Sequence, residues 1–225
     1  MRPARPGAIF SSFRIRVTFR YLFSAIIAGL RVEVSVINRV ENIASPLTEI
    51  EWVFGYGSLV WRPGFDFRHS ILAELAGWRR DFSQGSPDHR GTPESPGRVL
   101  TLRRDTESRC TGIAYRVDKA SWPSVVDYLD VRESGGYTRQ IVNVALADGV
   151  TVSALTYIAL PDNPHACQPE PMERLVELIQ SRSGPSGHNL DYVLNLAEAL
   201  LTHGIRDDAV ETLADYLRRV EAGEP

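Results

Sequence analysis

The sequence predicts an α+β fold, a mostly antiparallel sheet or small barrel with helices packed at one side. The first observation is the order of the elements: strand-like runs, one helix, a hairpin, and then helices up to the C-terminus. The second is the dipeptide Asp148-Gly149. It joins two runs of alternating apolar and polar residues and so indicates a hairpin between antiparallel strands.

The first strand is predicted at residues 52–54, Trp-Val-Phe, and the strand-like pattern resumes at residues 59–61, Leu-Val-Trp. Between them lie residues 55–58, Gly-Tyr-Gly-Ser. Glycine inside such a run indicates an unusual backbone angle or a close approach of another group to the main chain. Residues 71–83 alternate in part and predict the next strand.

Residues 84–97 are rich in Gly, Pro, Ser and Asp and predict a loop. Two short strands are predicted after it, at residues 98–104 and 110–117. The polar residues 105–108 predict a turn that separates them.

A helix is predicted at residues 118–133, with Asp118 or Ser121 as the capping residue at its start. Pro123 falls in the first turn, where a missing N–H costs little. The apolar residues recur at helical spacing and define one face, formed by Trp122, Val125, Val126 and Leu129.

The remaining elements are the hairpin and the C-terminal helices. Residues 137–160 contain the two strands on either side of Asp148-Gly149. From Pro169 onward the period becomes helical, and helices are predicted at residues 169–181, 189–204 and 207–222.

The composition is that of an ordinary globular domain. The chain has 225 residues, 43% of them hydrophobic and 24% charged, with a formal net charge of −3. This charge gives no electrostatic footprint for nucleic acid. The two cysteines, Cys110 and Cys167, are too few for a disulfide framework or a zinc site of their own, and predict free thiols in a reducing cytoplasm.

The N-terminal segment differs from the rest, because arginine is the only charged residue type in residues 1–32. Its apolar run, residues 21–30, is too short to cross a bilayer, which takes about 20 apolar residues. The segment is open to three interpretations: a start site placed too early, a genuine extension, or a targeting leader. We therefore expect an Arg-rich extension at residues 1–48 and one domain at residues 49–225.

Several familiar chemistries lack their motifs. The glycines at 55 and 57 are not followed by the third glycine of a dinucleotide fingerprint, and the chain has no P-loop and no complete G-x-S-x-G. The five histidines form no H-E-x-x-H motif and no close pair, so no metal site is predicted.

Three polar clusters remain that packing alone does not explain: residues 55–58, 84–98 and 128–140. In the third, Glu133 falls where the predicted helix meets Gly135-Gly136 and the next strand begins. A carboxylate at such a boundary can project into a cleft. The alternative is a surface glutamate paired with Arg132 or Arg139.

At these residues the sequence resembles the ChaC-type γ-glutamylcyclotransferases, the glutathione-specific branch of the γ-glutamylcyclotransferase superfamily. The resemblance rests on "WVFGYGSLVWRPGF", "QGSPDHRGTPESPGRVLTL" and "YLDVRESGGYTR", in this order, and on "SGPSGHNLDYVLNL" nearer the C-terminus. It covers the chain from about Trp52 to about Ala222 and implies a γ-glutamylcyclotransferase-like fold.

The resemblance implies a carbon–nitrogen lyase that cleaves glutathione into 5-oxoproline and cysteinylglycine in the cytoplasm, without a cofactor. Glu133 matches the family's catalytic glutamate. The substrate-binding loop is matched by Phe54, Gly55, Tyr56, Gly57, Ser58 and Leu59. The expected partner is a small molecule, with no nucleic acid and no membrane, and the oligomeric state is not predicted.

This chemistry suits the residues present. The substrate's α-amine attacks its own γ-carbonyl, so no enzyme nucleophile is needed, and one carboxylate can carry the proton. Backbone N–H groups of the glycine-rich turn can form a nest for an anion.

The roles of some residues stay open from the sequence. Ser58 either hydrogen-bonds the substrate or stabilises the turn, and Tyr56 either lines the pocket or packs. Arg90 either faces a second substrate carboxylate or forms a salt bridge in its loop. Tyr137 either steers Glu133 or belongs to the core. Two other functions also stay open: cyclotransfer on other γ-glutamyl amines or peptides, and a non-catalytic binding module on the same fold.

Overall fold

The computed structural model describes residues 22–27, 30–35 and 50–223. By its contacts the chain forms two compact units, Met1–Ala44 and Ser45–Pro225. In the first unit, β1 (Leu22–Ile27) pairs antiparallel with β2 (Leu30–Ser35). Most of the predicted extension, residues 1–48, lies outside the described residues, so its interpretation stays a prediction.

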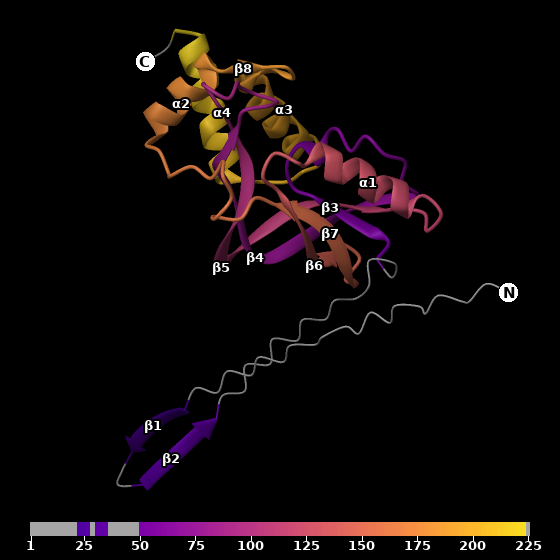
Figure 1. Ribbon diagram of the computed structural model, residues 1–225, viewed down its shortest axis with the longest axis vertical. Coiled ribbons are helices and arrows are strands. Elements are labelled where there is room, and N and C mark those ends of the chain that lie inside the picture. The colour runs from indigo at the N-terminus through magenta and orange to yellow at the C-terminus, as the bar shows by residue number, and fades with distance from the viewer. Residues whose placement is uncertain (1–21, 28–29, 36–49, 224–225) are drawn as a thin grey trace, which may run out of the picture. The chain divides into compact units, whose positions relative to one another are not determined.

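The second unit is built on a closed barrel with strand order β3-β5-β4-β6-β7 (Figure 1). Neighbouring strands pair antiparallel, except that β3 and β7 close the barrel as a parallel pair. This confirms the predicted α+β fold with a small, mostly antiparallel barrel. The strands are β3 (Trp52–Gly55), β4 (His69–Ser86), β5 (Gly97–Arg116), β6 (Thr138–Leu146) and β7 (Thr151–Ile158).

Strand β5 corrects the prediction of two short strands. It runs unbroken from Gly97 to Arg116, paired with β4 along its length. The register shifts between the pairs Trp78↔Arg104 and Ala76↔Arg109, so the polar residues 105–108 form a bulge. Within this bulge the Asp105 carboxylate accepts hydrogen bonds from Glu107 N and Ser108 Oγ and so gives both groups a partner. The same local chemistry is typical of turns, and the sequence pattern therefore predicted a chain reversal.

The start of the loop region also differs from the prediction. Residues 59–61 do not resume a strand, because Ser58–Val60 form the 3₁₀ turn η2. The predicted loop at residues 84–97 is shorter, since β4 extends to Ser86. A small hairpin of β8 (Ser183–Gly184) and β9 (Gly187–His188) precedes the third helix and was not predicted.

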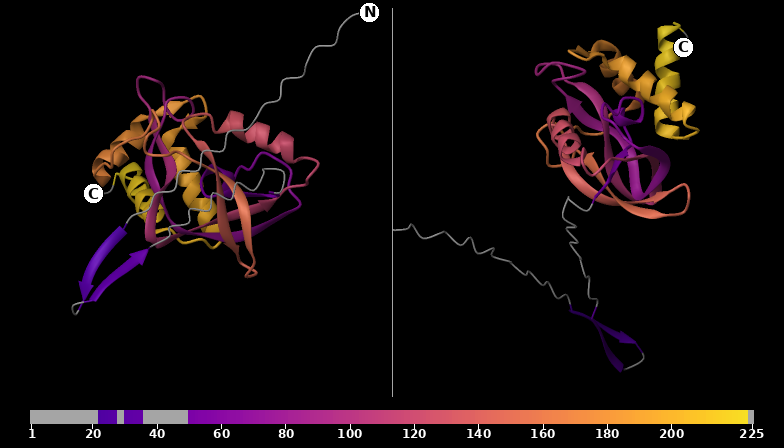
Figure 2. Two further views of the ribbon diagram at one scale, coloured as in Figure 1. Left: turned by 60° about the horizontal axis from the view of Figure 1, so that its bottom comes forward. Right: turned by 90° about the vertical axis from the view of Figure 1, so that its right-hand side faces the viewer.

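The predicted helices are confirmed and lie on one side of the barrel (Figure 1). They are α1 (Trp122–Arg132), α2 (Met172–Ser181), α3 (Asn189–Thr202) and α4 (Asp208–Glu221). The last three pack against one another, and Figure 2 shows α1 apart from them.

Helix α1 buries the four apolar residues that its sequence pattern predicted. Its start differs in one detail. Ser121 is the N-cap residue, but its side chain makes no capping hydrogen bond, and Pro123 in the first turn removes one of the N–H groups that would need a partner.

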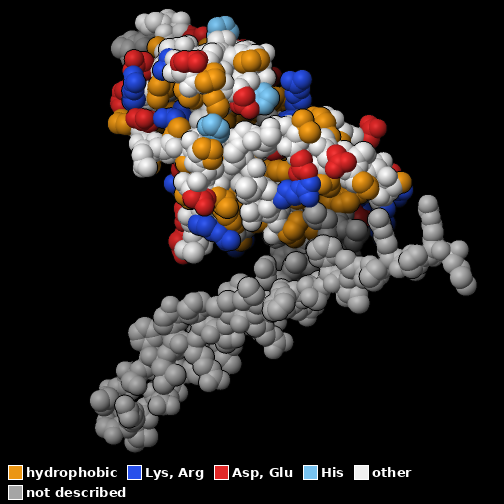
Figure 3. Space-filling view, in the orientation of Figure 1, with side chains coloured by type: hydrophobic (Ala, Val, Ile, Leu, Met, Phe, Trp, Pro, Cys, Tyr) orange, Lys and Arg blue, Asp and Glu red, His pale blue; other side chains and the backbone are white. Residues whose placement is uncertain are grey.

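The core fills the barrel and the interface with the helices, where Phe54, Leu155 and Leu196 are fully buried. On the surface, Figure 3 shows acidic and basic side chains interspersed over one face of the described residues. No helix of the described residues is long and apolar enough to span a membrane.

Candidate active site

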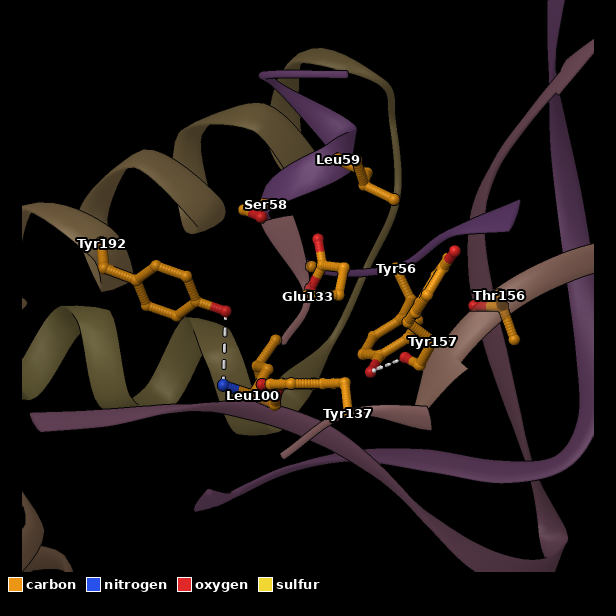
Figure 4. Close-up of a pocket in the computed structure, with 10 residues that line it drawn as sticks. Tyr56, Ser58, Leu59, Leu100, Glu133, Tyr137, Thr156, Tyr157 and Tyr192 are labelled. Atoms are coloured by element: carbon orange, nitrogen blue, oxygen red, sulfur yellow. Dashed lines mark hydrogen bonds between the residues drawn. The ribbon is translucent and has the colours of Figure 1, made fainter. Parts of the chain in front are cut away.

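Two connected hollows lie between the end of β3, the end of α1 and helix α3. The first, here called the inner pocket, has a volume of about 40 Å³ (Figure 4). The second, the outer groove, has about 420 Å³ and shares Ser58, Glu133, Tyr137 and Tyr192 with it. The inner pocket is lined by Tyr56, Gly57, Ser58, Leu59, Leu100, Glu133, Tyr137, Thr156, Tyr157 and Tyr192.

The loop after β3 forms one wall of the inner pocket. Its first internal hydrogen bond runs from Val60 N to Gly57 O at 2.9 Å, so the N–H groups of Ser58 and Leu59 lie ahead of that bond. The hydroxyl of Tyr115 donates to Leu59 O at 2.7 Å and holds the loop from the barrel side. The loop therefore presents main-chain N–H groups from a fixed backbone.

The two glycines of this loop have different neighbours. A Cβ atom on Gly55 would lie 2.7 Å from the Cβ of Leu59, so packing within the loop requires glycine there. A Cβ on Gly57 would meet the Tyr192 hydroxyl at 3.5 Å, an ordinary contact across the inner pocket. The group that comes close at Gly55 is thus Leu59 of the same chain, and only Gly57 borders the pocket.

Glu133 caps the C-terminus of α1 and projects into the inner pocket. Figure 4 shows it between the loop carrying Ser58 and Leu59 and the ring of Tyr56. Only 15% of its side chain is exposed. Burial raises the pKa of this carboxyl, and the Arg132 guanidinium works against that rise.

Of the two partners considered for a surface glutamate, only Arg132 is paired with Glu133. Arg132 Nε lies 3.2 Å from Glu133 Oε1, whereas Arg139 is paired with Asp130. Glu133 is largely buried all the same, so the pairing belongs to the pocket and not to the solvated surface.

Arg132 is a residue that the sequence reasoning missed as part of the site. Its guanidinium donates to Ser58 Oγ at 2.9 Å, and to the carbonyl oxygens of Arg62 at 2.6 Å and Pro63 at 3.0 Å. One side chain therefore fastens the loop after β3 to the end of α1. Its place directly before Glu133 was the only signal in the sequence.

The turn after Glu133 is held from beneath by Gln84, which is fully buried. Its amide donates to Gly135 O at 3.0 Å and exchanges hydrogen bonds with the amide of Asn163. Gly136 has φ +96°, and a Cβ there would lie 2.9 Å from Gln84 Nε2, so glycine is required. This buried contact fixes where the chain leaves Glu133 and enters β6.

Tyrosines form the remaining walls. Tyr56 donates to Tyr157 O at 2.8 Å, and Tyr137 donates to Leu100 O. The hydroxyl of Tyr192 accepts from Leu100 N at 3.3 Å. Burial raises the pKa of Tyr192 to about 12 and raises those of Tyr56 and Tyr137 as well. These hydroxyls stay protonated at neutral pH and surround Glu133 with neutral groups.

Comparison with known proteins identifies the family. Residues 51–220 match the family model of the ChaC-like proteins. The chain belongs to the ChaC-like family. Three curated relatives carry cyclotransferase names, and each is similar over most of its length.

Gamma-glutamylcyclotransferase 2-3 of Arabidopsis thaliana is 40% identical, over 75% of this chain and 89% of its own. The human glutathione-specific gamma-glutamylcyclotransferase 1 is 39% identical, over 73% and 77%. The glutathione-specific gamma-glutamylcyclotransferase of Escherichia coli strain K12 is 34% identical, over 76% and 74%.

A solved structure agrees with the ChaC-like fold. It is the crystal structure of the yeast γ-glutamyl cyclotransferase specific to glutathione, which superposes with a TM-score of 0.70 at 28% identity. The match covers 75% of this chain and 95% of the yeast chain. The family assignment and the barrel therefore rest on sequence and on structure.

In this ChaC-like chain the expected site residues divide into three groups. Tyr56 to Leu59, Glu133 and Tyr137 meet in the inner pocket. Phe54 is fully buried, and neither it nor Gly55 lines the inner pocket or the outer groove. Arg90 lies in the outer groove, where it donates to His188 O at 2.9 Å.

Metal ligands were not expected, and the described residues contain no group of three or more His, Cys, Asp or Glu side chains that could hold a metal ion. Tyr192 was missed as a pocket residue, because its place on α3 gives no local pattern.

Proposed function

We propose that this protein is a glutathione-specific γ-glutamylcyclotransferase that converts glutathione into 5-oxoproline and cysteinylglycine. The observation that carries the proposal is the buried carboxylate of Glu133, which faces the loop of Gly57 to Leu59 across the inner pocket. The names of the three relatives support a γ-glutamylcyclotransferase, and those of the human and Escherichia coli relatives also name glutathione.

The reaction closes a ring within the substrate. The α-amino nitrogen forms a bond to the γ-carbonyl carbon, and the amide C–N bond to cysteine breaks. The pocket's first task is to hold the γ-glutamyl chain folded, and such positioning is worth about 7–11 kcal/mol in favourable cases. Because nucleophile and electrophile belong to one molecule, Ser58 is not required as a nucleophile.

Glu133 is the proposed proton carrier. At neutral pH the α-amine is mostly ammonium, so its proton must leave before attack. Glu133 takes this proton and later delivers it to the departing amide nitrogen, a contribution of typically about 10²–10⁴-fold in rate. The burial that raises the pKa of Glu133 makes it a better base than an exposed glutamate.

The loop is the proposed cradle for the charge of the γ-glutamyl group. The N–H groups of Ser58 and Leu59 are directed to the α-carboxylate or to the oxyanion that develops on the γ-carbonyl. Ser58 Oγ accepts a hydrogen bond from Arg132, which leaves its own proton to donate to the substrate. Phe54 and Gly55 support the loop from behind.

The proposal extends to the organisation of the chain. Residues 49–225 form the catalytic domain, and the partner is a small-molecule substrate, with no nucleic acid and no membrane. We place the enzyme in the cytoplasm, since Cys110 and Cys167 are free thiols and such thiols suit a reducing compartment.

The test is to incubate the purified full chain with glutathione and to measure 5-oxoproline and cysteinylglycine by mass spectrometry. Glu133→Gln is assayed beside it, with circular dichroism as the check on folding. Both products from the wild type, and a rate lower by about 10²-fold or more in Glu133→Gln, are expected.

Two outcomes would change the proposal. Equal rates in both proteins would keep the reaction but move the base to another residue. A folded wild-type protein without product would count against glutathione, and other γ-glutamyl amines would then be assayed.

A further inference from the structure

We infer that the outer groove is the subsite for the leaving dipeptide and that Arg90 binds the carboxylate at the dipeptide's C-terminal end. This inference rests on the proposed function, and it names the feature by which the site would recognise glutathione among γ-glutamyl compounds. It is carried by the space, the charges and the fixed position of Arg90.

The inner pocket has about 40 Å³, and one water-sized group needs about 10–15 Å³ of such volume. It therefore takes only the reacting end of a substrate. The remainder lies in the outer groove of about 420 Å³, which opens from the inner pocket at the four residues they share.

The outer groove is lined by side chains of both charges. Its basic side chains are those of Arg62, His89, Arg90 and Arg132, and its acidic ones are those of Asp88 and Glu133. Arg132 is engaged with Ser58 and Glu133. His89 lies 3.8 Å from Asp88 and hydrogen-bonds Ser186 at 3.0 Å.

Arg62 and Arg90 remain, and within the described part of the chain neither forms an ion pair. Among the described residues, the groove thus holds two guanidinium groups that no carboxylate contacts at ion-pair distance, although Asp191 acts on Arg90 electrostatically.

Arg90 is held in position by contacts at both ends of the residue. Its Nη1 donates to His188 O at 2.9 Å, and its guanidinium carbon lies 5.7 Å from the ring centroid of Tyr192. Its main-chain N–H donates to Ser86 Oγ at 3.1 Å. Both ends of the residue are held, so the cation is positioned before substrate arrives and loses little entropy on binding.

The surroundings of Arg90 favour an anionic ligand. Partial burial is the largest effect on its pKa and lowers it, Tyr192 and Asp191 raise it, and the charge of Arg62 lowers it by less. A half-buried cation is stabilised by a bound carboxylate, which a guanidinium meets with two parallel hydrogen bonds.

The length of a γ-glutamyl tripeptide matches the distance from the inner pocket to Arg90. A γ-glutamyl tripeptide has one carboxylate at the reacting end and a second at its far end, up to about 7 Å further along two extended residues. Tyr192 spans this interval, because its hydroxyl lies in the inner pocket and its ring lies against Arg90. Arg90 is placed for the far carboxylate. A γ-glutamyl dipeptide carries this group one residue too near, and a γ-glutamyl amine lacks it.

The experiment compares two variants of the full chain on matched substrates. Arg90→Met removes the charge and Arg90→Lys keeps it, while Arg109→Met, on the exposed face beside Glu74, is the control. The substrates are glutathione, glutathione with its glycine carboxylate converted to the amide, and γ-glutamylcysteine. Steady-state kcat and KM are measured for each pair.

We expect Arg90→Met to lose about 10- to 150-fold in kcat/KM on glutathione, mostly through KM, as for a lost charged hydrogen bond. On the amide it should match the wild type, since the carboxylate that Arg90 would bind is already absent. Arg90→Lys should recover part of the loss, and Arg109→Met should behave as wild type.

Other results overturn the inference in distinguishable ways. Equal losses on glutathione and on the amide would make Arg90 a structural residue of its loop. Unchanged kinetics on both would remove it from the site. A folded wild type that cleaves none of the three compounds would overturn the proposed function itself.

Discussion

Arg132 and Glu133 are neighbours in sequence, and the Arg132 guanidinium opposes the effect of burial on the pKa of the Glu133 carboxyl. The burial of Glu133 raises the pKa of its carboxyl, and the guanidinium 3.2 Å away lowers it. The other titratable groups around the carboxyl are Tyr56, Tyr137, Tyr157 and Tyr192, whose pKa values are all raised. They stay neutral over the working range, so Arg132 is the charge that tunes Glu133.

Replacing Arg132 should therefore change the pH dependence of the reaction. In Arg132→Met the pKa of Glu133 rises, because the group that lowers it is gone. A base with a higher pKa is protonated at higher pH, so the acid limb of the kcat/KM profile should move to higher pH. A loss of about tenfold should also remain at high pH, since the loop loses its hydrogen bonds to Arg132.

Profiles of wild type, Arg132→Met and Arg132→Lys check this prediction. The substrate's own amine titrates identically in all three, so a displaced limb reports the enzyme. Arg132→Lys keeps a cation and should shift less. A loss of the same size at every pH would mean that Arg132 acts only through the position of the loop.

At the scale of elements, one buried side chain links the barrel, the loop and α4. The Arg80 side chain, in β4, is only 1% exposed. It donates to Tyr56 O at 2.8 Å, to Thr111 O at 2.6 Å and to Asp207 Oδ2 at 2.9 Å. Asp207 in turn caps α4 by accepting from Val210 N at 3.1 Å. The start of the C-terminal helix α4 is therefore linked through Arg80 to the backbone of Tyr56, which lines the inner pocket.

Substitution of Asp207 should separate these two roles. Asp207→Ala leaves the buried guanidinium without its carboxylate and removes the cap, and we expect it to cost about 3–5 kcal/mol of unfolding free energy. Asp207→Asn keeps a capping acceptor, worth typically about 1 kcal/mol, and should cost less than alanine. Urea unfolding of the three proteins measures both. Equal costs for Ala and Asn would show that the cap contributes nothing.

Elements with a strong hydrophobic period were predictable from the sequence. Elements whose extent depends on irregular strand pairing were not. The helices follow from apolar spacing, and the hairpin at Gly149, with φ +91°, follows from its turn residues. The sequence predicted two strands where the structure has the single strand β5. The residues around Asp105 form a bulge, and their sequence pattern is the same as that of a turn. Only pairing with β4 distinguishes the two.

At the scale of the whole molecule, the site lies within one of the two compact units. All residues of the inner pocket fall between Tyr56 and Tyr192, inside the unit Ser45–Pro225. The described residues that line the outer groove also belong to this unit.

A truncated chain of residues 49–225 should fold with the melting temperature of the same domain in the full chain and should keep its kcat/KM on glutathione. Thermal unfolding followed by circular dichroism, and the product assay, test this directly. A truncated protein that folds but loses activity would give the N-terminal segment a part in the site. One that fails to fold would show that the domain boundary is wrong.

The sequence by itself determined the α+β class, the helices, the hairpin and the motifs that meet in the inner pocket. These follow from local patterns, because the spacing of apolar residues and the residues that favour turns can be identified within a short stretch of the chain. It did not determine why Gly55 is glycine, or that Arg132, Gln84 and Tyr192 belong to the site.

Those features depend on contacts between distant parts of the chain. Gln84 of β4 meets Asn163 in the segment after β7, and Arg132 of α1 meets Ser58 in the loop after β3. Closure of the barrel brings these parts of the chain together. The sequence identified the Glu133 carboxylate as a candidate site group. The tertiary structure decided its burial and its neighbours, and through them its pKa, because desolvation and hydrogen bonding depend on what the fold packs around a group and not on the residues beside it in the chain.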